Sequence, residues 1–425
     1  MIRATLYTTT TSPKLDYILR YFFEERLGIS LTITVYKHIF QQSDDTIKIN
    51  YSSELLSAAD LSIYQSDYFS DFDLGRIPDF EAALNIDREG KIDTDIFAAT
   101  FYLLARIEEY SDLDRDNHGR FKASNSILSK RALLDKPIVD VWVEEIRQYI
   151  SVACGKSILP RSYSSLSTVD IDHVYAYKGK SLLVKIGGLI KNIFSFQLAK
   201  LMDRFSNKDP YDTYEEILSA HENKDIVLKF FILTSERTNY DRSLSPENPA
   251  FIEIAKHLSE KALVGIHPSY GSMHDASEIS KQRKKLQSIT GKTIDGSRQH
   301  FLRVTFPETY RALIESGIQE DYSMGYAEMI GYRAGTSIPF KWYDLLEDKA
   351  TNLKVVPFQI MDVTLKKYLE LSPASALREC KKIMEANRLV NGQTCIIWHN
   401  SSFYDKEGWN GWDIFYKELL SVASA

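Results

Sequence analysis

The chain has 425 residues, of which 44% are hydrophobic and 26% are charged, and this composition is ordinary for a globular protein of about two domains. A formal net charge of −6 argues against nucleic-acid binding, and three cysteines are too few for a disulfide framework. The N-terminus has no apolar leader and lysines interrupt the apolar window 181–199, so we expect a cytoplasmic protein without a transmembrane span.

Residues 1–155 read as a mixed α/β unit. Thr32–Tyr36 and Thr46–Tyr51 alternate between polar and apolar side chains, which is the pattern of a strand. Ile96–Tyr110 follows acidic residues that can cap a helix, and it is apolar on nearly every face. We therefore expect a helix there that is buried or docked against the second domain.

Two charged segments carry weaker signals. Asp112–Gly119 superficially resembles a calcium-binding loop, but Asn117 and Ala123 stand where the loop needs Gly and Glu, so a solvated acidic turn is the preferred interpretation. Residues 177–209 are basic and lightly amphipathic, and peripheral contact with a membrane surface is one interpretation. The preferred alternative is a helical insertion with a solvated charged face.

Residues 160–425 alternate between strand-like and helix-like segments. Strands are expected at 225–234, 263–267, 353–360 and 393–398. Helices are expected at 249–259, 278–288, 305–317 and 375–387. This alternation predicts an α/β fold with a mainly parallel sheet.

The segment Leu166–His173 is an apolar run that ends in two carboxylates. Asp170 and Asp172 are spaced i, i+2, so on a strand they project from the same face. Two carboxylates this close repel each other unless a cation or a proton lies between them. The pattern therefore indicates a metal site or an acid/base pair. The alternative is a strand that runs into a loop, where aspartates cap and solvate the chain.

Three further strand-like segments end in basic side chains. His267 and His399 each close an apolar run, and Arg298 and His300 lie together in a third short segment. A single histidine at a strand end is more often structural than catalytic. However, the ends of different strands converge on one site in barrels and open α/β sheets, so four such ends favour a functional site.

Five motifs follow one another along the chain: Thr168-x-Asp, His267-Pro-Ser, Arg298-x-His-Phe, Asp321-Tyr-Ser-Met-Gly-Tyr and Ile396-Ile-Trp-His. Their order and spacing resemble the polysaccharide deacetylase family, the chitooligosaccharide deacetylase-like enzymes of carbohydrate esterase family four. Four segments look more specifically like a Bacteroidetes-type branch with an extra N-terminal domain of unknown function: Gly265–Tyr270, Gly296–Arg303, Gly331–Gly335 and Trp398–Ser402. The resemblance implies a distorted (β/α)7 barrel at 160–425, preceded by a smaller mixed α/β domain at 1–155.

The resemblance also implies a chemistry, in which a divalent metal, with zinc preferred, supports removal of acetyl groups from the N-acetylated sugars of a polysaccharide or its precursor. Asp170 would be the general base and His399 the general acid that protonates the leaving amine. Arg298 would pair with the base and orient it. Asp172 and His267 would hold the metal, which polarises the acetamide carbonyl and activates water.

The chain departs from the family pattern at two places. Ile171 separates two aspartates that are usually adjacent, so their roles as base and ligand could be exchanged. The usual second histidine, at i+4 from His267, is replaced by Gly271. His300 is the preferred replacement ligand and His274 the second choice. A set of Asp172, His267 and His300 would still leave the open position that a catalytic site needs.

Aromatic residues are frequent around these motifs and suit a glycan subsite, because sugar rings stack on aromatic planes. The residues expected to bind substrate are Tyr270, Phe301, Tyr326, Arg333 and Trp398, with Trp409 and Trp412 as surface candidates. Gly271 keeps a second hypothesis open, namely a catalytically silent deacetylase-like protein that binds glycan or acts as a scaffold in surface-polysaccharide assembly. A glycosidase fits poorly, because it leaves the histidines unexplained.

Overall fold

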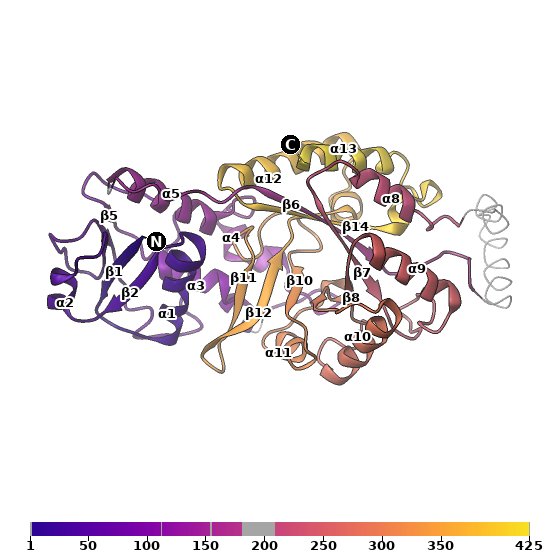
Figure 1. Ribbon diagram of the computed structural model, residues 1–425, viewed down its shortest axis with the longest axis horizontal. Helices are drawn as coiled ribbons and strands as arrows, with labels where there is room; N and C mark the ends of the chain where they lie inside the picture. Colours follow the sequence, from indigo (N-terminus) through magenta and orange to yellow (C-terminus); the bar gives the residue numbers. More distant parts are fainter. Residues whose placement is uncertain (1, 112, 154, 181–208, 425) are drawn as a thin grey trace.

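The computed structural model describes residues 2–111, 113–153, 155–180 and 209–424. Within these residues the strands form two sheets. Figure 1 shows the sheet of the N-terminal part (residues 2–153) at one end of the molecule and the sheet of the C-terminal part (residues 160–424) toward the other end.

The N-terminal sheet is entirely parallel and has the order β2-β1-β3-β4-β5. Its strands are β1 (Arg3–Thr8), β2 (Ser30–Thr34), β3 (Ile47–Tyr51), β4 (Leu61–Ile63) and β5 (Lys91–Ile92). The helices of this part are α1 (Pro13–Arg20), α2 (Lys37–Gln42), α3 (Ile96–Leu104), α4 (Ile127–Lys130) and α5 (Ile138–Ala153). Parallel strands are covered on both faces, and accordingly five of the six residues of β1 are buried. The expected mixed α/β character is therefore present.

Helix α3 is the buried helix that the apolar run predicts. All nine of its residues are buried, and Asp95 caps its first turn by accepting a hydrogen bond from the backbone N–H of Ala98 at 3.0 Å. The helix is shorter than expected because Arg106 adopts a left-handed conformation, with φ of 53°. The chain then continues as a 3-10 turn from Ile107 to Tyr110.

The second sheet curls into a half-barrel with the strand order β11-β12-β10-β9-β8-β7-β6-β14-β13. Its strands are β6 (Ser164–Ile171), β7 (Val227–Leu233), β8 (Leu263–His267), β9 (Gly296–Ser297), β10 (Glu320–Met324), β11 (Phe340–Asp344), β12 (Lys349–Pro357), β13 (Ile360–Met361) and β14 (Gln393–His399). All neighbouring pairs are parallel except β11 with β12.

The half-barrel departs from a regular barrel in two ways. The antiparallel strand β11 extends its edge, and β9 is only two residues long. Only two residues separate β12 from β13, so one continuous segment pairs with β10 through residues 354–357 and with β14 through residues 360–361. This segment thus connects the two sides of the curled sheet.

Helices connect most of the strands of the second sheet and lie around it (Figure 1). They are α8 (Tyr214–His221), α9 (Pro249–Lys261), α10 (Ala276–Thr290), α11 (Glu308–Glu315), α12 (Pro373–Leu389) and α13 (Trp412–Ser424). The predicted segments of this part coincide with β7, β8, β12, β14, α9, α10, α11 and α12, with ends that differ by a few residues. Prolines in the first turns of α9 and α12 fit helix starts, because proline lacks an N–H that would be unpaired there.

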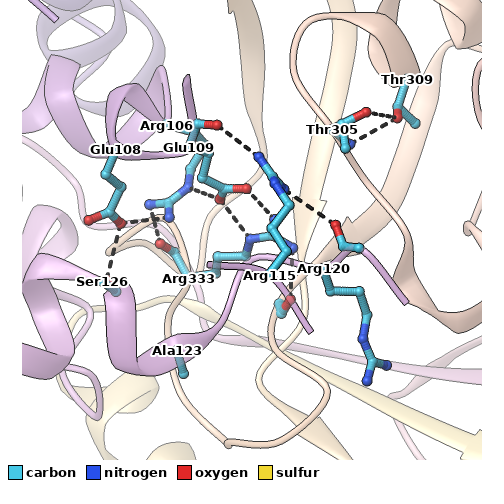
Figure 2. A network of polar contacts seen from close by, with 12 residues as sticks. Arg106, Glu108, Glu109, Arg115, Arg120, Ala123, Ser126, Thr305, Thr309 and Arg333 are labelled. Carbon is cyan, nitrogen blue, oxygen red and sulfur yellow. Dashed lines mark hydrogen bonds and ion pairs between the residues drawn. The ribbon is translucent and has the colours of Figure 1, made fainter. Parts of the chain in front are cut away.

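The two parts of the chain share one hydrophobic core. Phe101 of α3 packs edge-on against Tyr343 of β11, with ring centroids 5.1 Å apart, and Tyr17 of α1 packs against the same ring at 5.1 Å. Figure 2 shows Arg106 and Glu109 pointing toward Arg333 of the C-terminal part, whose Nε donates to Glu109 Oε1 at 2.9 Å. The N-terminal part is therefore docked on the barrel through both apolar and ionic contacts.

Among the described residues, no helix is long and apolar enough to cross a membrane. Residues 181–208, which make up most of the basic segment predicted to touch a membrane surface, lie outside the described part of the chain. That prediction therefore stays a prediction.

Candidate active site

A cavity of about 230 Å³ lies at the carboxyl ends of the barrel strands. In parallel α/β sheets this edge is where loops from several strands converge. The lining residues come from both parts of the chain: His118, Arg120, Asp170, Asp172, His267, Gln299, His300, Phe301, Leu302, Ala327, Met361, Val363, Lys367, Tyr368 and His399. The six polar residues proposed for catalysis and metal binding are therefore brought together, because five line the cavity and Arg298 contacts one of them.

Strand β6 delivers the two aspartates to this cavity. Asp170 is 3% exposed, and β6 pairs with β14 in a register that places Asp170 opposite His399. Arg298, which is fully buried, holds Asp170 from the other side, with its Nη1 3.1 Å from Asp170 Oδ1. The guanidinium is itself fixed, because Nη1 also donates to Thr168 Oγ1 at 2.7 Å and Nε donates to the Tyr322 carbonyl at 3.0 Å.

Asp172 faces two imidazole rings. Its Oδ1 lies 3.2 Å from Nε2 of His267 and 3.6 Å from Nε2 of His300. The three side chains can each offer one ligand atom within 4.8 Å of the others. The carboxylate oxygen is buried and accepts no well-formed hydrogen bond from the described residues. A buried oxygen without a partner is costly, so this geometry is suited to an added cation.

The second nitrogen of each imidazole shows which tautomer is present. Nδ1 of His267 contacts the backbone carbonyl of Arg298, and Nδ1 of His300 lies 2.8 Å from Oδ1 of Asp241. A carbonyl and a carboxylate only accept, so both Nδ1 atoms carry the proton. In the neutral form of each ring, Nε2 then carries the lone pair and faces Asp172. Histidine ligands of metals are held by this kind of contact on their other nitrogen.

The charges around Asp172 and His267 favour a positively charged partner in the site. Burial alone would raise the pKa of Asp172, but His300, His267 and His399 together hold it well below the usual range. Burial alone would lower the pKa of His267, but Asp170 and Asp172 raise it. The cluster therefore favours positive charge, and a proton and a divalent cation would compete for the same position.

His399 is oriented by Asp362, a carboxylate that no motif in the sequence singles out. Asp362 follows β13; its Oδ1 lies 2.8 Å from Nδ1 of His399, and its Oδ2 accepts from the His399 backbone N–H at 2.9 Å. Burial alone would lower the pKa of His399, but Asp362, followed by Asp172 and Asp170, raises it to about 10. Nε2 lies 3.9 Å from Asp172 Oδ2, on the cavity side.

The missing i+4 histidine is not a consequence of crowding. A Cβ added at Gly271 would meet nothing within 4 Å. His274, the second choice as replacement ligand, is exposed, and its Nε2 contacts Thr305 Oγ1 at 2.5 Å. It is therefore not part of the cluster, whereas His300 is.

Several expected substrate contacts are corrected by burial. Tyr326, Arg333 and Trp398 are at most 2% exposed and do not line the cavity. Arg333 is committed to Glu109, and Trp398 packs 4.7 Å from the Tyr416 ring. Trp409 and Trp412, expected at the surface, are each 3% exposed because they pack against each other at 5.5 Å. Phe301 does line the cavity, and Tyr270 packs against it at 5.2 Å.

Residues of the N-terminal part complete the cavity, and no sequence motif predicts this. The turn 116–120 supplies His118 and Arg120, and Asp116 shapes it by accepting from both of their backbone N–H groups at 2.9 Å. Arg120 then donates to the Phe301 carbonyl at 3.2 Å and to the Tyr368 hydroxyl at 2.9 Å. The acidic turn therefore supports the wall of the cavity, and the charge of Asp116 is paired within the turn with Arg120.

Residues 4–154 match a family described only as a family of unknown function, DUF7033. No curated protein matches the chain. Similar solved structures include a Mycobacterium smegmatis protein described as a polysaccharide deacetylase, which is 13% identical with a TM-score of 0.40 over 63% of this chain and 86% of that chain.

A CE4 family pseudoenzyme from Bacillus anthracis is 11% identical, with a TM-score of 0.31 over 62% of each chain. A protein described as a novel carbohydrate deacetylase is 9% identical, with a TM-score of 0.36 over 95% of this chain and 79% of that one. At these scores the similarity carries no inference about function, which must come from the residues of the cavity.

Proposed function

We propose that this protein is a metal-dependent hydrolase that removes acetyl groups from N-acetylated sugars of a polysaccharide or its precursor. The observation that carries the proposal is the convergence of Asp172, His267 and His300 in one cavity with Asp170 and His399. A metal-dependent site that hydrolyses an amide needs a cation site, a base and an acid within reach of one another, and the cavity offers candidates for all three.

The donor set fits a divalent cation such as zinc, since one carboxylate oxygen and two imidazole nitrogens leave an open coordination position. The orphaned Oδ1 of Asp172 and the inward lone pairs of His267 and His300 are the features that a cation would satisfy. When bound, the cation would supply Lewis acidity that polarises the acetamide carbonyl and makes water more acidic.

Asp170 is the proposed base. Its carboxylate is held by Arg298 at one oxygen and lines the cavity, so it is placed to take a proton from the attacking water. The arrangement supports Asp170 as base and Asp172 as ligand over the exchanged assignment, because only Asp172 faces both His267 and His300.

His399 is the proposed acid. Asp362 holds its Nδ1, so Nε2 is the nitrogen that faces the cavity. A pKa raised to about 10 keeps the ring protonated at neutral pH, and this is the form that can protonate a leaving amine. The hydrolysis then yields acetate and a free amino sugar.

Gly271 favours a second candidate function, a silent deacetylase-like protein that binds glycan or acts as a scaffold. Without the usual i+4 histidine the cation would be held by fewer histidines of the usual motif. The hydrolase therefore requires that His300 coordinates the cation in place of the absent histidine.

Acetate release from N-acetylglucosamine oligomers tests the function directly. Purified protein should release acetate, lose the activity on treatment with a chelator, and regain it on addition of zinc or another divalent ion. The Asp170→Asn protein, with its metal content verified, is the matched control for contaminating activity. Binding of the oligomers without any acetate release by the metal-loaded protein would establish the silent alternative.

A further inference from the structure

A three-layer stack of side chains lies beside the cavity. The ring of Tyr240 is parallel to that of Tyr270, with centroids 3.9 Å apart and an interplanar angle of 17°. The guanidinium carbon of Arg303 also lies 3.9 Å from the Tyr270 centroid, so these two neighbours cannot occupy the same face of Tyr270. Tyr270 is thus covered on both faces, whereas Tyr240 forms the end of the stack and is 48% exposed.

The stack adjoins the cavity through two of the residues that line it. The Phe301 ring stands edge-on to Tyr240 at 5.9 Å and to Tyr270 at 5.2 Å. His118, from the N-terminal part, stands edge-on to Tyr240 at 6.2 Å, and its Nδ1 lies 3.2 Å from the Tyr270 hydroxyl. The exposed ring of Tyr240 is therefore next to the cavity and separated from it by a single layer of side chains.

The stack of Tyr240, Tyr270 and Arg303 is also connected to the proposed metal cluster. Asp241, the residue after Tyr240, accepts a hydrogen bond from the Tyr270 backbone N–H at 2.9 Å. The same oxygen contacts Nδ1 of His300 at 2.8 Å, while the other oxygen accepts from Thr238 Oγ1 at 2.8 Å. An exposed aromatic ring on such a fixed support loses little conformational freedom when a ligand binds to it.

We propose that Tyr240 is the platform for a second sugar ring, next to the sugar whose acetamide enters the cavity. The face of an aromatic ring is electron-rich, and the C–H bonds on one face of a pyranose are weakly positive, so the two stack. The substrate class is accordingly an oligomer of N-acetylated sugars, and a single sugar is disfavoured. This inference rests on the proposed function. It adds a role for Tyr240, supported by Tyr270 and His118, in selecting oligomers over single sugars.

Calorimetric binding of N-acetylglucosamine and of its β-1,4-linked tetramer tests this subsite in the full-length, zinc-loaded protein. All measurements use an Asp170→Asn background so that no ligand is consumed. The tetramer should bind more tightly than the monomer. Adding Tyr240→Ala should weaken the tetramer about tenfold, the scale of one lost stacking contact, and leave the monomer unchanged. Tyr240→Phe should behave like Tyr240, because stacking needs the ring and not the hydroxyl.

A matched control is Tyr64→Ala, since Tyr64 is 45% exposed, follows strand β4 of the N-terminal sheet and does not line the cavity, so its loss should affect neither ligand. Equal binding of both ligands, or equal weakening of both by Tyr240→Ala, would overturn the subsite. The two proposals fail separately. Tetramer binding that depends on Tyr240 without acetate release contradicts only the hydrolase, and acetate release with binding indifferent to Tyr240 contradicts only the subsite.

Discussion

Single side chains decide what the cavity can bind. His267 and His300 each use Nδ1 to contact an acceptor, so their Nε2 atoms present lone pairs to Asp172 from 3.2 and 3.6 Å. When both rings are neutral, the Nε2 lone pairs and the Asp172 carboxylate repel one another unless a positive charge lies between them. Mutation of these residues and of the neighbouring acid and base therefore separates cation binding from the chemistry.

Replacing Asp170 with asparagine should remove the base and spare the cation. We expect metal content to stay at the wild-type level, because Asp170 is not among the three converging ligands, and turnover to fall by roughly 10²-fold or more, the scale of a lost general base. Acetate release at saturating substrate and metal analysis of the same sample check both parts. Loss of the metal together with the activity would show that Asp170 is a ligand.

Replacing His399 with alanine should discriminate between leaving groups. A sugar amine is a poor leaving group and needs a proton, whereas an activated ester such as a nitrophenyl acetate leaves without one. The variant should therefore lose far more activity on N-acetylated sugars than on the activated ester. An equal loss on both substrates would mean that His399 positions or folds the site and does not donate a proton.

Among the secondary-structure elements, strand ends were the most predictable feature. Strand β8 coincides with the predicted 263–267, because a buried strand is a short apolar run and His267 marks the end of that run. Strand β10 was missed because its sequence is polar. Asp321 and Ser323 are nonetheless buried there, since Ser323 donates to Asp321 at 2.9 Å. Side-chain hydrogen bonds that allow polar residues to be buried are not visible in the periodicity of the sequence.

The 3-10 turn after α3 carries a buried ion cluster whose loss should be measurable. Glu109 is flanked by Arg106 and Arg333, with side-chain exposures of 0%, 0% and 2% (Figure 2). The Glu109→Gln substitution leaves Arg333 without its charge partner and Arg106 with Glu108 alone, so it should lower the free energy of unfolding by about 3–5 kcal/mol. Urea unfolding at pH 7 measures this. The control Glu54→Gln breaks an exposed pair with Lys37 and should cost under about 1 kcal/mol.

The same cluster predicts a pH dependence. Burial alone would raise the pKa of Glu109, but Arg333 and Arg106 hold it below its usual 4.5. A lowered folded-state pKa means that this stabilisation is complete above pH 4.5 and is lost as the pH falls through the lower folded value. The difference in stability between wild type and Glu109→Gln should therefore shrink in acid. A difference that is constant from pH 7 to acid would contradict the assignment.

For the whole molecule, the α/β class of both parts was predictable and their joint cavity was not. The class follows from apolar periodicity within short segments. His118 and Arg120 reach the cavity only because the N-terminal part packs on the barrel through Phe101 and Tyr343, which are 242 residues apart in the chain. No local pattern encodes such a contact. The N-terminal part is, on this account, a component of the site.

A fragment comprising residues 160–425 should consequently be defective. Removing the N-terminal part uncovers Tyr343 and leaves Arg333 without Glu109, and it deletes one wall of the cavity. We expect the fragment to aggregate or to unfold at a lower temperature, and to bind glycan oligomers more weakly, with chain 1–155 supplied in trans as the control. A fragment with the thermal midpoint and the affinity of the full chain would show that the two parts are independent.

The proposed metal centre depends most on His300 as the ligand that replaces the absent histidine. Isothermal titration of zinc into the metal-free protein, with metal content checked by elemental analysis, tests it most directly. Wild type and His274→Ala should each bind one equivalent with the same affinity, whereas His300→Ala, folded by circular dichroism, should bind at least roughly 10²-fold more weakly, the effect of losing one ligand from a small site. Unchanged zinc affinity in a folded His300→Ala protein would contradict the proposed metal centre.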